Sequence, residues 1–166
     1  SNTATIINNL TMNVNGTLLG SSPVINNSTI NVNGTLTGAG NVTNAGTISI
    51  ASGGVLSTTG NMTNNTGTKT INVNGTFQVP VPFTNTRIIN VNGASPNPVI
   101  NTNTLFGGSG ASLNIGSNTL TTFTTSTVTS AIPTVTVATS GTTFNVANAI
   151  VGVDTAFTIA NGATTT

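Results

Sequence analysis

Apolar and polar residues alternate along short stretches of this chain, and most stretches contain an Asn-Gly pair. The pattern is clearest in INVNGTL at 30–36, and near copies span 12–18, 71–77 and 88–94. Alternation at every second residue is typical of a β-strand with one buried face. The pattern therefore predicts short strands, each followed by a turn at Asn-Gly.

Looser copies of the same phrase occupy 48–56, 113–120, 134–144 and 157–163. The turn glycines of successive copies lie 18 to 25 residues apart. Recurrence in this range indicates a solenoid, in which each coil buries its apolar face only by stacking on its neighbours. We therefore expect an all-β parallel β-helix of about eight coils. The marker glycines are Gly16, Gly34, Gly53, Gly75, Gly93, Gly116, Gly141 and Gly162.

The apolar residues on the two sides of Asn-Gly distinguish two local folds. A hairpin with Asn33 and Gly34 as its turn places Val32 and Leu36 on opposite faces of the sheet. The same mismatch recurs in the other copies, which argues against a hairpin. If the chain instead turns a corner and continues around a coil, Val32 and Leu36 both point inward.

The Asn-Gly pairs are therefore predicted to form the corners of the coils. Gly supplies the positive φ that other residues resist, and Asn tolerates a left-handed conformation better than most. Stacked coils align the corner amides into ladders that hydrogen-bond from coil to coil. The predicted corner ladder consists of Asn15, Gly16, Asn33, Gly34, Asn74, Gly75, Asn92 and Gly93.

Irregular segments interrupt the repeat. Pro80 and Pro82 mark 78–86 as an excursion or an edge, because proline cannot donate to an interior ladder. Glycines at 107–110 mark another loop. We expect one solenoid domain over 1–166, with regular coils at 1–120 and a less regular β region at 121–166. The alternative is a β-sandwich or jelly roll completed by a donated strand, because turn signals in the C-terminal third partly follow a sandwich spacing.

Two stretches also support a family resemblance. INVNGTLTGAGNVTNAGTISI at 30–50 and LNIGSNTLTTF at 113–123 resemble coils of secreted bacterial β-helical surface proteins, of the filamentous-haemagglutinin and autotransporter-passenger type. The likeness covers roughly 5–123. It implies a right-handed parallel β-helix displayed outside the cell, used for adhesion or as a surface fibre. The chain differs from that type in having no Tyr and no Trp.

Charge is almost absent. Lys69, Arg87 and Asp154 are the charged side chains, and the formal net charge is +1. The polar surface must come from the 37 Thr and 27 Asn residues. Two cations do not make a basic patch, so we expect no nucleic-acid partner. Because near-zero charge promotes association, self-assembly is tolerated. We expect no membrane insertion, since no apolar run is long enough to span a bilayer.

The chain lacks the side chains that most enzymes need. It has no His, no Glu and no Cys, so Asp154 has no partner for acid-base work and redox chemistry has no thiol. We therefore predict a non-enzymatic protein without cofactor or metal. Lys69 and Asp154 suffice chemically for an intramolecular amide crosslink, but a solvated lysine is the default interpretation.

Two further surface features are candidates for function. Thr-X-Thr spacing, as at Thr134 and Thr136, is similar to flat ice-binding faces, although a Thr-rich strand surface is the simpler interpretation. That spacing also occurs at Thr119, Thr121, Thr125, Thr127 and Thr129. Asn-X-Thr sequences make Asn15, Asn33 and Asn74 candidate glycosylation sites at exposed corners.

The terminal segments give the sharpest functional hypothesis. Soluble solenoids protect their open strand edges with polar or charged caps. The first segment, 3–14, and the last, 155–166, contain no charge and have the pattern of ordinary strands. We predict that other copies of the chain cover these ends, through Ile6, Ile7, Leu10, Phe157 and Ile159, in an extracellular filament. The alternative is a fragment of a larger adhesin that binds glycan or a host surface.

Overall fold

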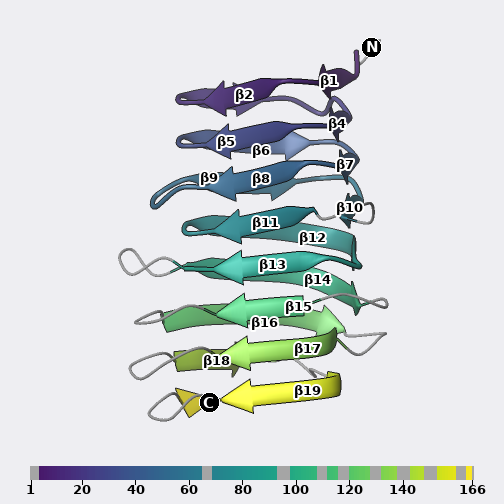
Figure 1. The fold of residues 1–166 in the computed structure, drawn as a ribbon. Helices are drawn as coiled ribbons and strands as arrows, with labels where there is room; N and C mark the ends of the chain where they lie inside the picture. Colours follow the sequence, from purple (N-terminus) through teal and green to yellow (C-terminus); the bar gives the residue numbers. More distant parts are fainter. Residues whose placement is uncertain are drawn as a thin grey trace.

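The protein is a stack of parallel β-coils in the computed structural model (Figure 1). The structure describes residues 4–64, 69–92, 98–107, 112–115, 120–127, 132–137, 143–147, 153–159 and 164–165. Every strand pair in these ranges is parallel. The predicted parallel β-solenoid is confirmed. The β-sandwich alternative is wrong, because it requires antiparallel pairing.

The first four coils have a strand on each of the three faces of the stack, and in the fourth coil the third-face strand continues into the next coil. Their first-face strands are β1 (Ile6–Asn8), β4 (Val24–Asn26), β7 (Val42–Asn44) and β10 (Met62–Asn64). Their second-face strands are β2 (Thr11–Val14), β5 (Thr29–Val32), β8 (Thr47–Ile50) and β11 (Thr70–Val73). Their third-face strands are β3 (Thr17–Leu19), β6 (Thr35–Ala39), β9 (Val55–Thr58) and the start of β12 (Thr76–Asn85).

Beyond these coils, the second face continues through β13 (Ile88–Val91), β15 (Ser112–Ile115), β17 (Ile132–Val137) and β19 (Val153–Ile159). The remaining strands are β14 (Val99–Gly107), β16 (Leu120–Thr127), β18 (Thr143–Ala147) and β20 (Thr164–Thr165). The three-stranded coils therefore number four rather than the eight predicted, whereas the second face alone runs through eight strands.

The core consists of apolar columns that run along the stack. Equivalent positions of successive coils carry the same kind of side chain, so each apolar residue packs between those above and below it. The second-face column contains Ile30, Ile48, Ile71, Ile89 and Leu113, each at most 1% exposed. Across the interior, Phe77 of the third face meets Phe83 of the first face edge to face, with ring centroids 5.3 Å apart.

Three of the Asn-Gly pairs, Asn15–Gly16, Asn33–Gly34 and Asn74–Gly75, lie between a second-face strand and a third-face strand. Val32 before the corner and Leu36 after it are both buried, at 0% and 4% exposure. A hairpin would have placed them on opposite faces. The chain therefore turns a corner and keeps both residues in the same core.

The reason for glycine at these corners differs from the prediction. Among the described glycines only Gly38 and Gly53 have a positive φ, of 72° and 77°. A Cβ atom at Gly34 would overlap the carbonyl oxygen of Gly16 in the coil above, and one at Gly75 would overlap that of Gly54. The stacked backbones, not left-handed torsions, exclude a side chain there.

The proline segment also differs from the prediction. Pro80 and Pro82 lie within β12, which passes from the third face to the first face without a loop excursion. Its pairing with β14 changes register between Val79 and Pro82. Proline is accommodated at this corner because the ladder is already interrupted there.

A pair of glycine substitutions tests the close-approach explanation. We expect Gly34→Ala to lower the free energy of unfolding by about 1–3 kcal/mol, because the new methyl group overpacks two backbones. Gly16→Ala, at the matching corner of the first coil, has no atom within 4 Å of its Cβ position. It should change that free energy by about 0.5 kcal/mol or less. Urea unfolding measures both, and equal effects would contradict the explanation.

Candidate functional site

A ladder of buried asparagines runs along the corner between the first and second faces. The side-chain amide of each residue donates from Nδ2 to Oδ1 of the residue one coil further on, over 2.7–2.9 Å. Exposure is 7% at the first residue and 2% or less at the others. The ladder, called here the inner ladder, consists of Asn8, Asn26, Asn44, Asn64 and Asn85.

The inner ladder also binds the backbone of the corner. Asn26 donates to the carbonyl of Thr47 at 3.0 Å, and its Oδ1 accepts the amide N–H of Ser28 at 3.3 Å. Asn44 donates to the carbonyl of Gly46 and accepts from its amide N–H. Asn85 makes the same two bonds with Arg87. Since unpaired buried polar groups are costly, this set of bonds satisfies a corner that water does not reach.

The Asn-Gly pattern did not reveal the inner ladder. Its signal is an asparagine two residues after an apolar residue, at the end of a short strand, as at Asn26 after Val24. These asparagines recur at intervals of 18, 18, 20 and 21 residues. Asn is so common in this chain that the inner set does not stand out from the outer ones.

The predicted corner ladder is only partly continuous. Asn33 donates to Asn15 at 2.8 Å, but the next coil has Ala51 at this position, and the row stops. Asn74 is half-buried, and its Oδ1 has no hydrogen-bond partner in the described structure. Asn92 follows it in the row and is exposed; its partner Gly93 lies outside the described residues. The glycosylation candidates Asn15 and Asn33 are exposed, whereas Asn74 is not.

A second polar row covers the outer side of the second face. Asn31 donates to Asn13 at 2.8 Å, and Asn90 and Asn114 continue the row by bonds of 3.1 and 3.0 Å. Asn72 also donates to the hydroxyl of Ser49 at 3.3 Å. The outer row consists of Asn13, Asn31, Ser49, Asn72, Asn90 and Asn114. In β17, Thr134 and Thr136 align with Ser112 and Asn114 of β15. The Thr-X-Thr pair is therefore not repeated in the neighbouring strand β15.

The charged residues are distributed in a way the sequence did not indicate. Lys69 and Arg87 precede equivalent strands of consecutive coils, and the amide of Ile88 donates to the carbonyl of Lys69. Their separation of 18 residues thus makes them neighbours. Asp154, in β19, lies four second-face strands beyond β11, about 19 Å along the stack. This separation excludes the Lys69–Asp154 crosslink, which the sequence offered only as an alternative to a solvated lysine.

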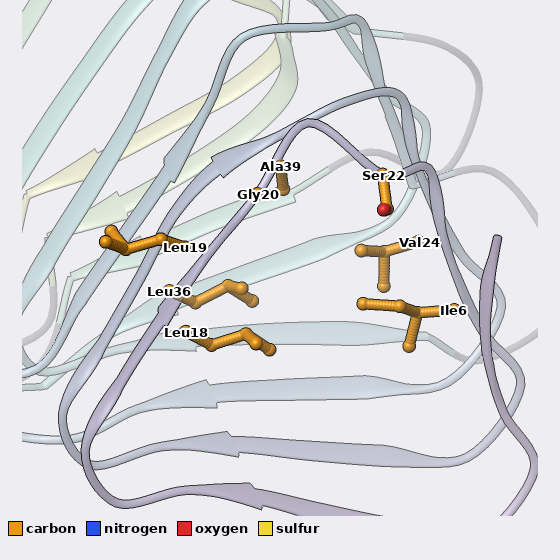
Figure 2. A pocket seen from close by; sticks show the side chains of 8 residues that line it. All are labelled: Ile6, Leu18, Leu19, Gly20, Ser22, Val24, Leu36 and Ala39. Atoms are coloured by element: carbon orange, nitrogen blue, oxygen red, sulfur yellow. The ribbon is translucent and has the colours of Figure 1, made fainter. Parts of the chain in front are cut away.

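The strands of the first coil have one neighbour each. Among the described residues, β1, β2 and β3 pair only with the second coil, so the outer side of the core is open in this structure. Leu18 and Leu36 point from the third face toward Ile6 and Val24 on the opposite wall, around a hollow of about 160 Å³ (Figure 2). Lower in the stack the same two columns contain Phe77 and Phe83, whose rings meet edge to face across the core.

Exposed apolar side chains are also concentrated in the first coil. Ile7, Leu10 and Leu19 are 58%, 79% and 70% exposed, and they are the large hydrophobic residues most exposed in the described part of the chain. The position of Leu19 is occupied by Thr37 in the second coil. The position of Ile7 is occupied by the half-buried Ile25 in the second coil and by Thr43 in the third. The first coil therefore has the most exposed apolar residues of the described stack.

The opposite end is formed by β19 and β20. β19 is the last strand of the eight-stranded sheet and contains Phe157 and Ile159, and β20 ends the other sheet. Both predicted assembly ends thus lie at sheet edges. No helix that could cross a bilayer occurs in the described ranges. They also contain no group of three or more His, Cys, Asp or Glu residues that could hold a metal.

Comparison with known proteins finds no match for this chain among protein-family models, curated proteins or solved structures.

Neighbouring asparagines test the inner ladder. We expect Asn26→Ala to lower the free energy of unfolding by at least about 2 kcal/mol, because it removes the buried bonds to Asn8 and Asn44 together with the bond to the carbonyl of Thr47. Asn27→Ala removes one exposed bond to Asn9 and should cost about 0.5 kcal/mol or less. Denaturant unfolding measures both, and a cost for Asn27→Ala as large as that for Asn26→Ala would contradict this role.

Proposed function

We propose that this chain is a non-enzymatic structural subunit of an extracellular filament, assembled end to end from copies of itself. The observation that carries the proposal is the open first coil. It combines unpaired strand edges, an apolar hollow and exposed apolar side chains, without a charged residue.

Open strand edges favour the addition of further strands. An edge presents a row of free N–H and C=O groups, and soluble proteins usually protect such edges with charge, proline or a covering element. The strands of the first coil, IIN, TMNV and TLL, contain neither charge nor proline. At the other end, Asp154 is the one formal charge in β19, and it precedes the segment 156–159 that continues the second-face register.

The open core supplies the apolar part of the interaction. Ile6, Met12 and Leu18 are half-buried and pack against the core on one side only. A coil placed on them would remove their remaining surface from water, at roughly 25 cal/mol per Å² of apolar area. Since the chain has a net charge of +1, electrostatic repulsion between copies is small.

Location and family rest on the sequence. The near absence of charge, the Thr- and Asn-rich surface and the resemblance to secreted bacterial β-helical surface proteins support a place outside the cell or on its surface. The amide ladders are compatible with that resemblance, since they make a long solenoid stable without ion pairs.

Two lysine substitutions on one strand test the filament. Met12→Lys places a charge at the open core, where a covering coil would bury it unpaired at a cost of several kcal/mol. We expect it to raise the concentration needed for assembly at least about tenfold, since 1.4 kcal/mol is a factor of ten. Thr11→Lys adds the same charge on the exposed side of β2 and should leave assembly nearly unchanged.

Sedimentation velocity over a range of protein concentrations measures both variants against the unmodified chain. We expect the mass of the unmodified chain to grow with concentration. A strict monomer at every concentration would refute the filament, and equal loss in both variants would refute assembly through the open core.

The outer row favours one second candidate function, a fragment of a larger adhesin that binds glycan. Its stacked amides present both donors and acceptors along the exposed side of one flat sheet, which suits the hydroxyls of a sugar chain. Tyr and Trp, which often stack on sugars, are absent from the chain.

A carbohydrate array tests this candidate. If the outer row binds glycan, the unmodified chain retains a glycan and Asn72→Ala reduces binding at least about tenfold, the loss of one good polar contact. Asn27→Ala, which alters an asparagine outside the outer row, should bind normally. No retained glycan, or equal loss in both variants, would rule out this surface.

A further inference from the structure

The second face carries one register through four aligned positions of its strands, and the shift in the last pair lies before Thr134, outside these positions. Thr11 to Val14 of β2 align with Thr29 to Val32 of β5, and each later strand aligns in turn up to β17. In the last pair, Val135, Thr136 and Val137 align with Phe157, Thr158 and Ile159. By this chain of pairings, Phe157, Thr158 and Ile159 hold the same positions as Met12, Asn13 and Val14.

From this register we infer that the filament junction is head to tail, with β19 of one copy paired in parallel with β2 of the next. Phe157 then lies beside Met12, Thr158 beside Asn13, and Ile159 beside Val14. This inference rests on the proposed filament and adds its polarity and its register.

The topology favours this arrangement over a symmetric one. β2 and β19 are opposite edges of one parallel sheet, so adding β19 to β2 continues the strand direction. Two first coils facing each other would pair β2 with β2 around a two-fold axis, in the antiparallel sense, and would close the assembly as a dimer. Only the head-to-tail contact leaves another open end for the next copy.

The residues that this junction would pair are also alike, apolar beside apolar and polar beside polar. The column that contains Met12 and Ile30 carries large apolar residues in every described coil up to Leu113, and Phe157 occupies its last position. A shift of one residue would set Met12 beside Thr158, and thus an apolar position beside a polar one. The in-register junction is the one that continues both the core column and the outer row.

Paired cysteines test the junction directly, because the chain has no cysteine of its own. In the variant Asn13→Cys/Thr158→Cys, the two sulfur-bearing residues of neighbouring copies would be about 4.8 Å apart between Cα atoms. That distance lies within the disulfide range of about 4.4–6.8 Å. Within one copy the same positions are separated by seven second-face steps, about 34 Å, so no intrachain bridge forms.

The matched control is Thr11→Cys/Thr158→Cys, which is two residues out of register. Its Cα atoms would be about 8 Å apart across the junction, beyond bridging distance. After oxidation of the assembled protein with copper phenanthroline, a non-reducing gel should show a ladder of linked oligomers for the first variant. The control should give at least tenfold less.

The outcomes separate this inference from the proposed function. Equal crosslinking of both variants would overturn the register. A crosslinked dimer from Asn13→Cys alone would overturn the polarity, because it requires two first coils to face each other. Assembly by sedimentation without crosslinking of the first variant would overturn the inference and keep self-association. The absence of assembly would overturn both.

Discussion

The structure depends on the in-register stacking of one coil on the next. Neighbouring backbones in a parallel sheet lie about 4.8 Å apart, so every residue has a fixed neighbour in the coil above and in the coil below. Apolar residues then form columns, as from Ile30 to Leu113, and amides form ladders, as from Asn8 to Asn85. Where a coil has no neighbour on one side, its strand edges on that side are unpaired and its apolar residues are only partly covered.

Asparagine does in this protein what charged residues do in many others. The inner ladder binds buried corner groups, and the outer row links side chains on the exposed sheet, in both cases without a net charge. A chain with two cations and one anion can therefore pair most of its buried corner amides without using charge. The strands β1, β2 and β3 of the first coil contain no charged residue.

The fold was predictable because apolar residues recur at equivalent positions in each repeat. Val32 and Leu36, on the two sides of Asn-Gly, were sufficient to distinguish a coil corner from a hairpin. The number of three-stranded coils was not predictable, since β12 fuses two strands through Pro80 and Pro82, which by local rules end a strand.

The sites were less predictable than the fold. The role of Gly34 depends on the carbonyl of Gly16 in the coil above, which no local pattern reveals. The inner ladder was hidden among 27 asparagines, and the proximity of Lys69 and Arg87 appears only when 18 residues are counted as one coil. Long-range register, not residue type, determines these features.

Helical reconstruction of the assembled protein by electron cryomicroscopy tests the central claim most directly. The account predicts strands perpendicular to the filament axis, with the spacing of about 4.8 Å continuing from one copy into the next along the second face. A break in that sheet at every subunit boundary, or copies joined side by side with their first coils uncovered, would contradict it.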